Sequence, residues 1–223
     1  SYVMSLLSPR VINDLELKKF GLTVLPANDL FVPQEDGDHI FFHDDVKKTQ
    51  AQFARFSKKD AEIYPVFDQY LREATNVVRR ILYETPVDPS KRDWKSIKAT
   101  AALLWRYRDV AGQMYRIADL MTQSVYDYLS RWFESDVVKA TLAYYASIGT
   151  FAGPKSPGTA YVLMHHIMGE HAGAGGWGFI KGGMGAISNA IAESGRRHGM
   201  ETRVNAVVEK VLVENGRAVG VEY

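Results

Sequence analysis

The feature of this sequence that most limits its fold is the stretch 44–147, which reads as helical almost throughout. Apolar residues recur there at helical spacing. The clearest series is Phe67, Tyr70, Leu71, Val77, Val78, Ile81 and Leu82. Such spacing marks the buried face of an amphipathic helix, and Ser57 with Asp60 three residues later resembles a capping pair. Helices are therefore expected to form the larger part of the chain.

Caps and breakers predict where these helices begin and end. Asp44 or Asp45 caps a helix that runs through Phe56, and Pro65 ends or kinks the helix that follows. A polar loop over residues 84–93 interrupts the run. Further helices are expected over residues 95–107, 110–121, 124–133 and 136–146, with Ser124 and Ser135 as caps. Residues 149–158 then form a loop, and residues 159–168 form a short helix or buried segment.

Short alternating stretches on both sides of the helical region predict strands. A hairpin is expected where Asp36-Gly37 separates residues 30–33 from residues 39–43, and Asn215-Gly216 is the strongest hairpin signal in the chain. Other strands are expected over residues 22–25, 201–205, 207–213 and 217–222, and a first helix over residues 9–20. Strands confined to the two ends of a helical chain give the fold class α+β.

The stretch GAGGWGFIKGGMGAIS, residues 173–188, contains the pattern G-x-G-x-x-G, which in other proteins holds a dinucleotide pyrophosphate. The required context is absent, because Gly182-Gly183 would break a helix that opened at Gly178. The helical signal instead begins at Met184 and stops before Gly199. The six-letter match is therefore interpreted as accidental. Gly182-Gly183 would let the backbone approach either a ligand or another segment of chain, and the residues alone leave this choice open.

Composition excludes several classes of protein. The chain has 223 residues, of which 46% are hydrophobic and 24% are charged, and these are the values of an ordinary soluble globular protein. With a net charge of +1 there is no electrostatic case for nucleic acid, and the pairs Arg79-Arg80 and Arg196-Arg197 are assigned to solvated helix faces. The absence of cysteine excludes a disulfide scaffold, a cysteine nucleophile and a thiolate metal site.

The termini bear on location and completeness. The sequence lacks a secretory signature and a long apolar run, so a cytoplasmic location is predicted. The chain starts at Ser1 without an initiator Met and stops within a predicted strand. We therefore expect it to be a piece of a longer protein.

Two groups of residues are candidates for chemistry. His165, His166 and His171 do not suit zinc, because adjacent histidines point to different faces, and no metal site is expected. Met114, Tyr115 and Met121 belong to an aromatic-rich helical region, residues 107–132. That region is either packed core or the wall of an apolar substrate cavity.

A resemblance adds to this reading. The stretch GFIKGGMGAISNAIAESGRRHGMETRVNAVVEKVLVENGRAVGVEY resembles the phytoene dehydrogenase-related FAD-dependent oxidoreductases, which share a Gly-Gly helix start, a following strand and a returning strand. The stretches SYVMSLLSPRVINDLELKKFGL, FSKKDAEIYPVF, WFESDVVKATLA and SPGTAYVLMHHIMG are similar to its subgroup of pyridine nucleotide-disulphide oxidoreductase domain-containing proteins. The resemblance covers nearly the whole chain.

The resemblance implies a division of the chain. Residues 1–170 would form a mainly helical substrate (cap) domain with an N-terminal hairpin. Residues 171–223 would form the Gly-Gly helix and β-hairpin at the edge of a FAD-binding domain. The family's true G-x-G-x-x-G would lie upstream of Ser1, and a segment that closes over the flavin would lie beyond Tyr223. FAD is thus expected in the parent protein and is not expected to be retained by this chain.

Roles for individual residues follow from the same resemblance. Gly182 and Gly183 would lie close to the cofactor domain, and Val208 would contact the adenine side of FAD through its backbone. The segment that approaches the substrate cavity would carry Trp177, Phe179 and Lys181, for which strand packing is the alternative role. Many phytoene dehydrogenases have a Tyr-Pro pair where this chain has Trp177-Gly178-Phe179, and this departure weighs against a carotenoid substrate.

Two hypotheses for function result. In the first, the parent is a FAD-dependent oxidoreductase, either a dehydrogenase or desaturase or an amine-oxidase-like enzyme, which removes hydride from a small apolar or amine substrate. In the second, the chain is a non-catalytic helical interaction module. Peripheral membrane contact and self-association are left open, as are the substrate, the electron acceptor, the catalytic residues and the oligomeric state.

Overall fold

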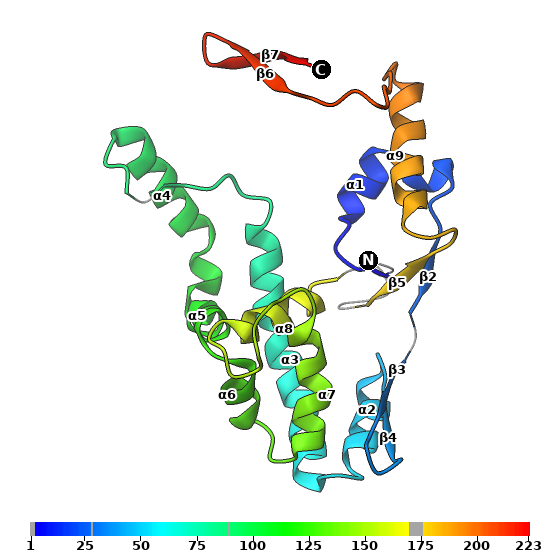
Figure 1. Ribbon diagram of the computed structural model, residues 1–223. Coiled ribbons are helices and arrows are strands. Elements are labelled where there is room, and N and C mark those ends of the chain that lie inside the picture. Colours follow the sequence, from blue (N-terminus) through cyan, green and yellow to red (C-terminus); the bar gives the residue numbers. More distant parts are fainter. Residues whose placement is uncertain (1–2, 28, 89, 170–175) are drawn as a thin grey trace.

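The computed structural model describes residues 3–27, 29–88, 90–169 and 176–223. A body of helices occupies the middle of the sequence, and small antiparallel sheets flank it (Figure 1). The α+β class predicted from the sequence is confirmed. Within the residues that the structure describes, none of the helices combines the length and the apolar character needed to cross a bilayer.

Side-chain caps fix the starts of most helices in this body. The elements are α2 (Val46–Phe53), α3 (Lys58–Ile81), α4 (Trp94–Arg106), η2 (Arg108–Gln113), α5 (Met114–Thr122), α6 (Val125–Ser130), α7 (Asp136–Ser147) and α8 (Thr159–Ile167). The predicted caps Ser57, Ser124 and Ser135 each accept a hydrogen bond from the third backbone N–H that follows. Of the two candidates for α2, Asp45 is the cap.

The main hydrophobic core lies between α3, α6, α7 and α8. Its largest fully buried side chains include Phe53, Phe67, Tyr128, Leu163 and Met164. Asp60 is also fully buried, and its carboxylate accepts hydrogen bonds from the backbone N–H groups of Glu134 (2.9 Å) and Ser135 (2.8 Å). This carboxylate therefore ties the first turn of α3 to the start of α7.

Pro65 was predicted either to end a helix or to kink it. It does not end one, because it lies inside the continuous helix α3. A proline inside a helix costs about 3 kcal/mol. The side chains of Tyr64 and Phe67 on either side of it are buried in the core. This packing outweighs the cost of the lost backbone hydrogen bond.

The strands form three separate sheets. β1 (Val3–Met4), β5 (Gly178–Ile180) and β2 (Val24–Pro26) pair antiparallel in the order β1-β5-β2. β3 (Leu30–Pro33) pairs with β4 (His39–Phe42), and β6 (Lys210–Glu214) pairs with β7 (Arg217–Glu222). Both predicted hairpins are confirmed. The strand predicted over residues 201–205 is wrong. β1 was not predicted, and β5 corresponds to the strand packing that was the alternative role of Trp177, Phe179 and Lys181.

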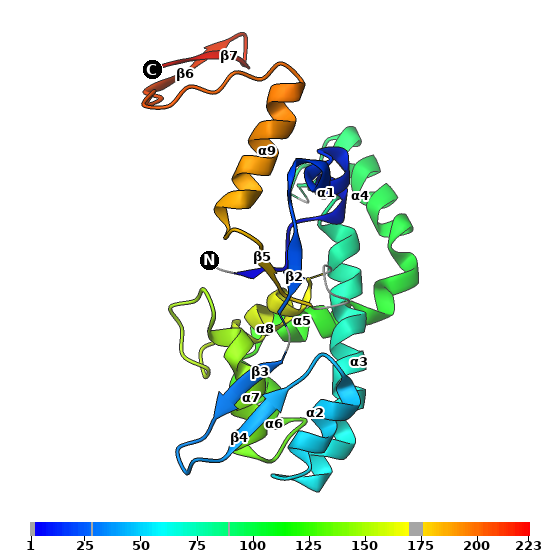
Figure 2. The same ribbon diagram turned by 90° about the vertical axis from the view of Figure 1, so that its right-hand side faces the viewer.

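A second, smaller core joins the start of the sequence to its later part. It contains Met4, Ile12, Leu17, Leu22, Ile180 and Ala190. The helix predicted over residues 9–20 is split into α1 (Pro9–Asp14) and η1 (Leu17–Phe20), because Glu16 between them adopts a left-handed conformation with φ 51°. Helix α9 (Gly185–Arg197) packs on η1 (Figure 2). Residues 3–26 thus pack with residues 178–197, and the boundary at residue 170 stays a prediction.

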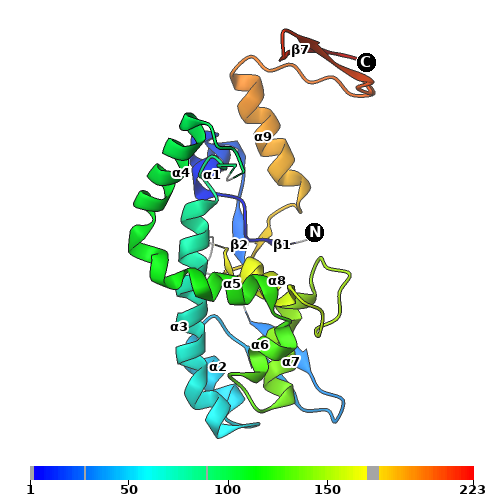
Figure 3. The same cartoon turned by 90° about the vertical axis from the view of Figure 1, so that its left-hand side faces the viewer.

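The C-terminal hairpin stands apart from both cores. Helix α9 ends before Gly199, which is left-handed as its predicted role as a helix stop requires. The chain then leads away to β6 and β7, whose residues are all exposed (Figure 3).

Candidate functional site

The segment around Trp177 is held at the junction of the two cores. The backbone carbonyl of Trp177 accepts a hydrogen bond from the N–H of Ala27 (2.8 Å), and its indole Nε1 donates to the carbonyl of His166 (3.0 Å). Lys181 at the other end of β5 donates its N–H to the carbonyl of Thr23 (3.0 Å). These bonds position Trp177 between the helical body and the β1-β5-β2 sheet.

Gly178 has a steric reason to be glycine. A Cβ atom on this residue would lie 2.4 Å from Cγ1 of Val24 and 3.2 Å from the carbonyl oxygen of Leu25. Strands β5 and β2 can approach this closely only because residue 178 has no side chain. The last glycine of the G-x-G-x-x-G match therefore serves sheet packing, whereas residues 173–175 lie outside the described residues.

A cavity of about 290 Å³, here called the aromatic cavity, opens beside Trp177. Its lining residues are Val3, Ala27, Asp29, Leu30, Phe42, Asp44, Tyr144, Tyr145, Trp177 and Phe179. The ring of Tyr145 packs edge-on against Trp177, with centroids 5.5 Å apart, and lies 5.9 Å from the ring of Phe42. Phe42 in turn contacts the core residues Phe53 and Tyr64. The wall of this cavity is thus continuous with the main core.

Two carboxylates complete the aromatic cavity. Asp29 Oδ1 lies 2.6 Å from Nδ1 of His43. Partial burial raises the pKa of the Asp44 carboxyl above its usual value, and the negative charge of Asp29 raises it further, while Arg72 opposes the shift. Burial likewise raises the pKa of Tyr145, and nearby Asp44 adds to that effect. Asp44 therefore lies in a less polar and more negative setting than an isolated surface carboxylate.

A second cavity of about 450 Å³, here called the α9 cavity, shares Val3 and Trp177 with the first. It also reaches Ile148, His166 and, at the start of α9, Met184 and Ile187. Trp177 is therefore a common wall of two cavities, one lined by aromatic and acidic residues and the other mainly by apolar residues. Of the neighbouring histidines, His165 has a lowered pKa, first because of burial and then because of His166.

The Gly182-Gly183 doublet forms the turn between β5 and α9. Both residues are left-handed, with φ values of 86° and 83°, and nothing lies within 4 Å of the position that a Cβ of Gly183 would take. A bulky group could therefore approach this turn, as the predicted role beside FAD requires. Val208 is 55% exposed, so it is also accessible to a cofactor. The contact of Gly182, Gly183 and Val208 with FAD stays a prediction.

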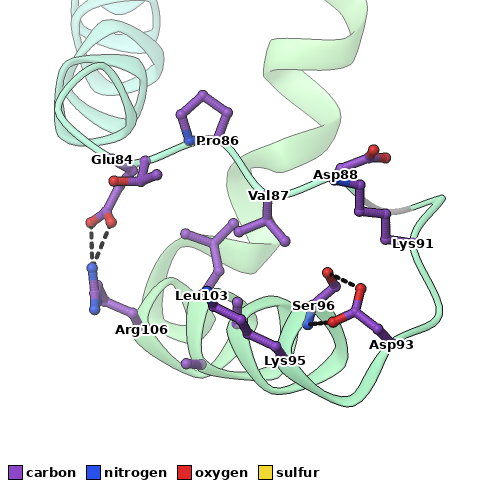
Figure 4. Close-up of a pocket in the computed structure, with 13 residues that line it drawn as sticks. Glu84, Pro86, Val87, Asp88, Lys91, Asp93, Lys95, Ser96, Leu103 and Arg106 are labelled. Atoms are coloured by element: carbon purple, nitrogen blue, oxygen red, sulfur yellow. Dashed lines mark hydrogen bonds and ion pairs between the residues drawn. The ribbon is translucent and has the colours of Figure 1, made fainter. Parts of the chain in front are cut away.

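A cavity of about 680 Å³, larger than either cavity beside Trp177, lies between α4 and the segment that precedes it, and is here called the α4 cavity (Figure 4). Nη1 of Arg106 donates to both carboxylate oxygens of Glu84 (2.7 and 2.6 Å). Asp93 is held by the N–H and hydroxyl of Ser96 (3.0 and 2.7 Å). Glu84, Arg106 and Asp93 therefore already have partners on the same surface, whereas Lys91 and Lys95 also line this cavity.

The structure brings together some of the predicted substrate residues. Trp177 and Phe179 line the aromatic cavity, whereas Lys181 is exposed just beyond β5. Met114, Tyr115 and Met121 are exposed on α5 and line neither cavity beside Trp177. Their contact with a substrate stays a prediction.

Sequence reasoning missed Asp29, Phe42, Asp44, Tyr144 and Tyr145. The only local signals were the run Phe42-His43-Asp44 and the tyrosine pair, and nothing in the sequence connects these segments to Trp177. His171 lies outside the described residues. Among the residues that the structure describes, no cluster of His, Asp or Glu suits a metal ion.

No protein-family model matches the chain. The chain is 35% identical over 238 residues to pyridine nucleotide-disulfide oxidoreductase domain-containing protein 2 of Rattus norvegicus, a match that covers 99% of the chain and 41% of the relative. It is 34% identical over the same shares to the Mus musculus protein of that name. It is also 21% identical to a 4,4'-diapophytoene desaturase of Methylomonas sp, over 90% of the chain and 35% of the relative. The chain spans less than half the length of these relatives, and the predicted resemblance is confirmed.

Proposed function

Because the chain belongs to the family of pyridine nucleotide-disulfide oxidoreductase domain-containing proteins, we propose that it forms the substrate-facing part of a FAD-dependent oxidoreductase. The names of the relatives support oxidoreductase parentage. In this proposal a small molecule lies against Trp177 and loses hydride to the flavin. The division at residue 170 into a cap domain and a FAD-domain edge is part of the proposal.

The observation that carries this proposal is the position of Trp177 as the wall between two cavities. The α9 cavity extends to Met184, directly after the Gly182-Gly183 turn where a bulky group has room to approach. A substrate in this cavity would therefore lie next to the predicted flavin edge. Cavities of a few hundred cubic ångströms with mostly apolar walls are typical of small-molecule sites.

The residues of this chain would supply position and a dry environment. Gly182, Gly183 and Val208 would hold one edge of FAD, and bound FAD would act as the hydride acceptor. Trp177 is fixed by its bond to the carbonyl of His166, so it presents a rigid surface to the substrate. Met184 and Ile187 would add apolar surface to the same space.

The test uses the full-length protein and two matched glycine variants. Gly183→Val and Gly37→Val both place a β-branched residue at a left-handed position (φ 83° and 87°) with open space around it, so their strain is similar. We expect purified wild-type protein and Gly37→Val to absorb near 450 nm, and Gly183→Val to lose most of the bound flavin while remaining folded. The absence of flavin from the wild-type protein would overturn the proposal.

One observation favours the alternative of a non-catalytic interaction module. None of the residues of α4 is buried, and Trp94, Leu104 and Trp105 on it are about 68–69% exposed. An apolar surface of this kind is typical of contacts with a partner, a second copy or a membrane. Full-length protein that lacked flavin but bound another macromolecule through α4 would support this alternative.

A further inference from the structure

The aromatic cavity is lined by aromatic and acidic residues together. Five aromatic residues line it, namely Phe42, Tyr144, Tyr145, Trp177 and Phe179, and the carboxylates of Asp29 and Asp44 lie among them. We propose that this cavity binds an organic ammonium cation, such as the head group of a protonated amine. The inference names the substrate class of the proposed oxidoreductase: an amine whose cationic group lies on the aromatic-cavity side of Trp177 while the rest of the molecule reaches the α9 cavity. It rests on that function for the reaction only, since binding itself needs no flavin.

The aromatic residues suit a cation with an apolar surface. An ammonium group is attracted to aromatic faces, most strongly to that of tryptophan, and the attraction grows when water is excluded. Tyr145 and Trp177 are both half-buried, and the centroids of their rings lie 5.5 Å apart. Their rings therefore form a fixed wall that needs little reordering on binding.

The local charge is negative in either state of His43. Arg72 on α3 acts on Asp44, but its Nε lies 2.6 Å from Asp68 Oδ2, so the Arg72–Asp68 pair is close to neutral. Asp29 and Asp44 then leave two negative charges, which fall to one if His43 beside Asp29 is protonated. Neither lysine nor arginine is among the described residues that line the cavity. A monovalent cation would relieve the repulsion between the two carboxylates.

The same features disfavour other ligands. A divalent ion such as Ca²⁺ takes six to eight oxygen ligands, but the wall here is mainly aromatic carbon. A wholly apolar molecule would strip water from Asp29 and Asp44 without giving them a partner, which is costly. The volume of about 290 Å³ lies at the lower end for ligand sites, so it suits a small head group.

The test is a titration of the 223-residue chain followed by NMR through the indole N–H signal of Trp177, assigned with Trp177→Phe. The probes are n-hexylammonium, hexan-1-ol with the same tail, and Ca²⁺. We expect the indole N–H signal to shift saturably with hexylammonium. The affinity for hexan-1-ol should be at least about tenfold lower, because hexan-1-ol cannot form the charge-assisted contact. Asp44→Asn and Asp29→Asn should each weaken hexylammonium binding by a similar factor and leave hexan-1-ol binding unchanged.

Glu35→Gln is the matched control, because it removes an exposed carboxylate in the turn between β3 and β4. It should bind hexylammonium as the wild type does. Three results would each overturn the inference: equal affinity for hexan-1-ol and hexylammonium, displacement of hexylammonium by Ca²⁺, or loss of hexylammonium binding in Glu35→Gln. If the full-length protein contains flavin but does not bind hexylammonium, only this inference is overturned. If the protein binds hexylammonium but lacks flavin, only the proposed function is overturned.

Discussion

The aromatic cavity and the α4 cavity differ in how their walls are supported. The α4 cavity is more than twice as large, yet α4 has no buried residue and its main contacts are with η2. The aromatic cavity is small, but Phe42 and Tyr145 connect its wall to the main core. Cavity size alone therefore does not identify a binding site. A wall that keeps its shape without the ligand is a better indicator.

Charge separates the two cavities in the same way. Around the α4 cavity, the hydrogen bond of Glu84 with Arg106 lowers the pKa of the Glu84 carboxyl, and the hydrogen bond of Asp93 with Ser96 does the same for Asp93. In the aromatic cavity, burial raises the pKa of Asp44. The first arrangement consists of groups that stabilise one another, and the second leaves a carboxylate that gains from an added cation.

The largest difference should appear when a wall residue is truncated. Phe42→Ala removes a ring that contacts Phe53, Tyr64 and Tyr145, and should lower the free energy of unfolding by about 3 kcal/mol. Leu103→Ala in the α4 cavity should lower it by about 1 kcal/mol, because Leu103 lies on a helix that has no buried residue. Urea denaturation measures both, and equal losses would break the distinction between the two walls.

A glycine substitution compares the strands beside Trp177 with the region next to α4. Gly178→Ala places a Cβ 2.4 Å from Val24, and should destabilise the fold by about 2 kcal/mol through overpacking. Gly112→Ala in η2 meets nothing within 4 Å, so it should be neutral or slightly stabilising. Thermal unfolding of both variants checks this, and a neutral Gly178→Ala would show that β5 can move away from β2.

Two arginines give a third comparison. Arg79 donates to the carbonyls of Ile167, Met168 and Gly169 (3.3, 2.9 and 3.1 Å), so its assignment to a solvated helix face is wrong. Arg79→Ala should lower the free energy of unfolding by about 1.5 kcal/mol, since partly buried carbonyls lose their donor. Arg106→Ala removes an exposed ion pair with Glu84 and should leave the unfolding midpoint nearly unchanged. Similar losses in urea denaturation would contradict this account.

The smallest effect concerns pH. The raised pKa of Asp44 means that the folded chain holds its proton to a higher pH than the unfolded chain, so Asp44 weakens stability as pH rises through that interval. Asp44→Asn should therefore stabilise the chain at neutral pH by less than about 1 kcal/mol, because Asp44 keeps part of its surface in contact with solvent.

The stabilisation by Asp44→Asn should vanish below pH 3.8, which is the ordinary pKa of an aspartate carboxyl. The charged and titratable groups around it are Asp29, His43, Arg72 and Tyr145. A stability gain that persisted in acid would mean that the substitution acts through packing. Chemical denaturation across pH, with Glu35→Gln as control, separates the two explanations.

Local signals in the sequence predicted much of the fold. The caps Ser57, Ser124 and Ser135 and the turn at Asn215-Gly216 depend on neighbouring residues only, and all are confirmed. The pairing of β5 with β1 and β2 joins segments more than 150 residues apart along the chain. A three-residue strand beginning at a glycine gives no propensity signal for such pairing.

The candidate site was predictable only in part. The resemblance identified the segment of Trp177 and Phe179, and both residues line the aromatic cavity. Asp29 lies in a loop, Asp44 lies between β4 and α2, and Tyr145 lies on α7. Only tertiary packing brings them to Trp177. An aromatic-rich helix does not reveal which of its rings face solvent, and Tyr115 on α5 is 59% exposed.

The central claim is that a substrate lies against Trp177, next to the flavin edge at Gly182-Gly183. A crystal structure of the full-length protein with bound flavin and a substrate or substrate analogue tests it most directly. The account predicts that the ligand is in van der Waals contact with Trp177 or Phe179 and that the flavin ring faces the α9 cavity. A ligand in the α4 cavity that touches neither residue, with the flavin remote from Gly183, would contradict it.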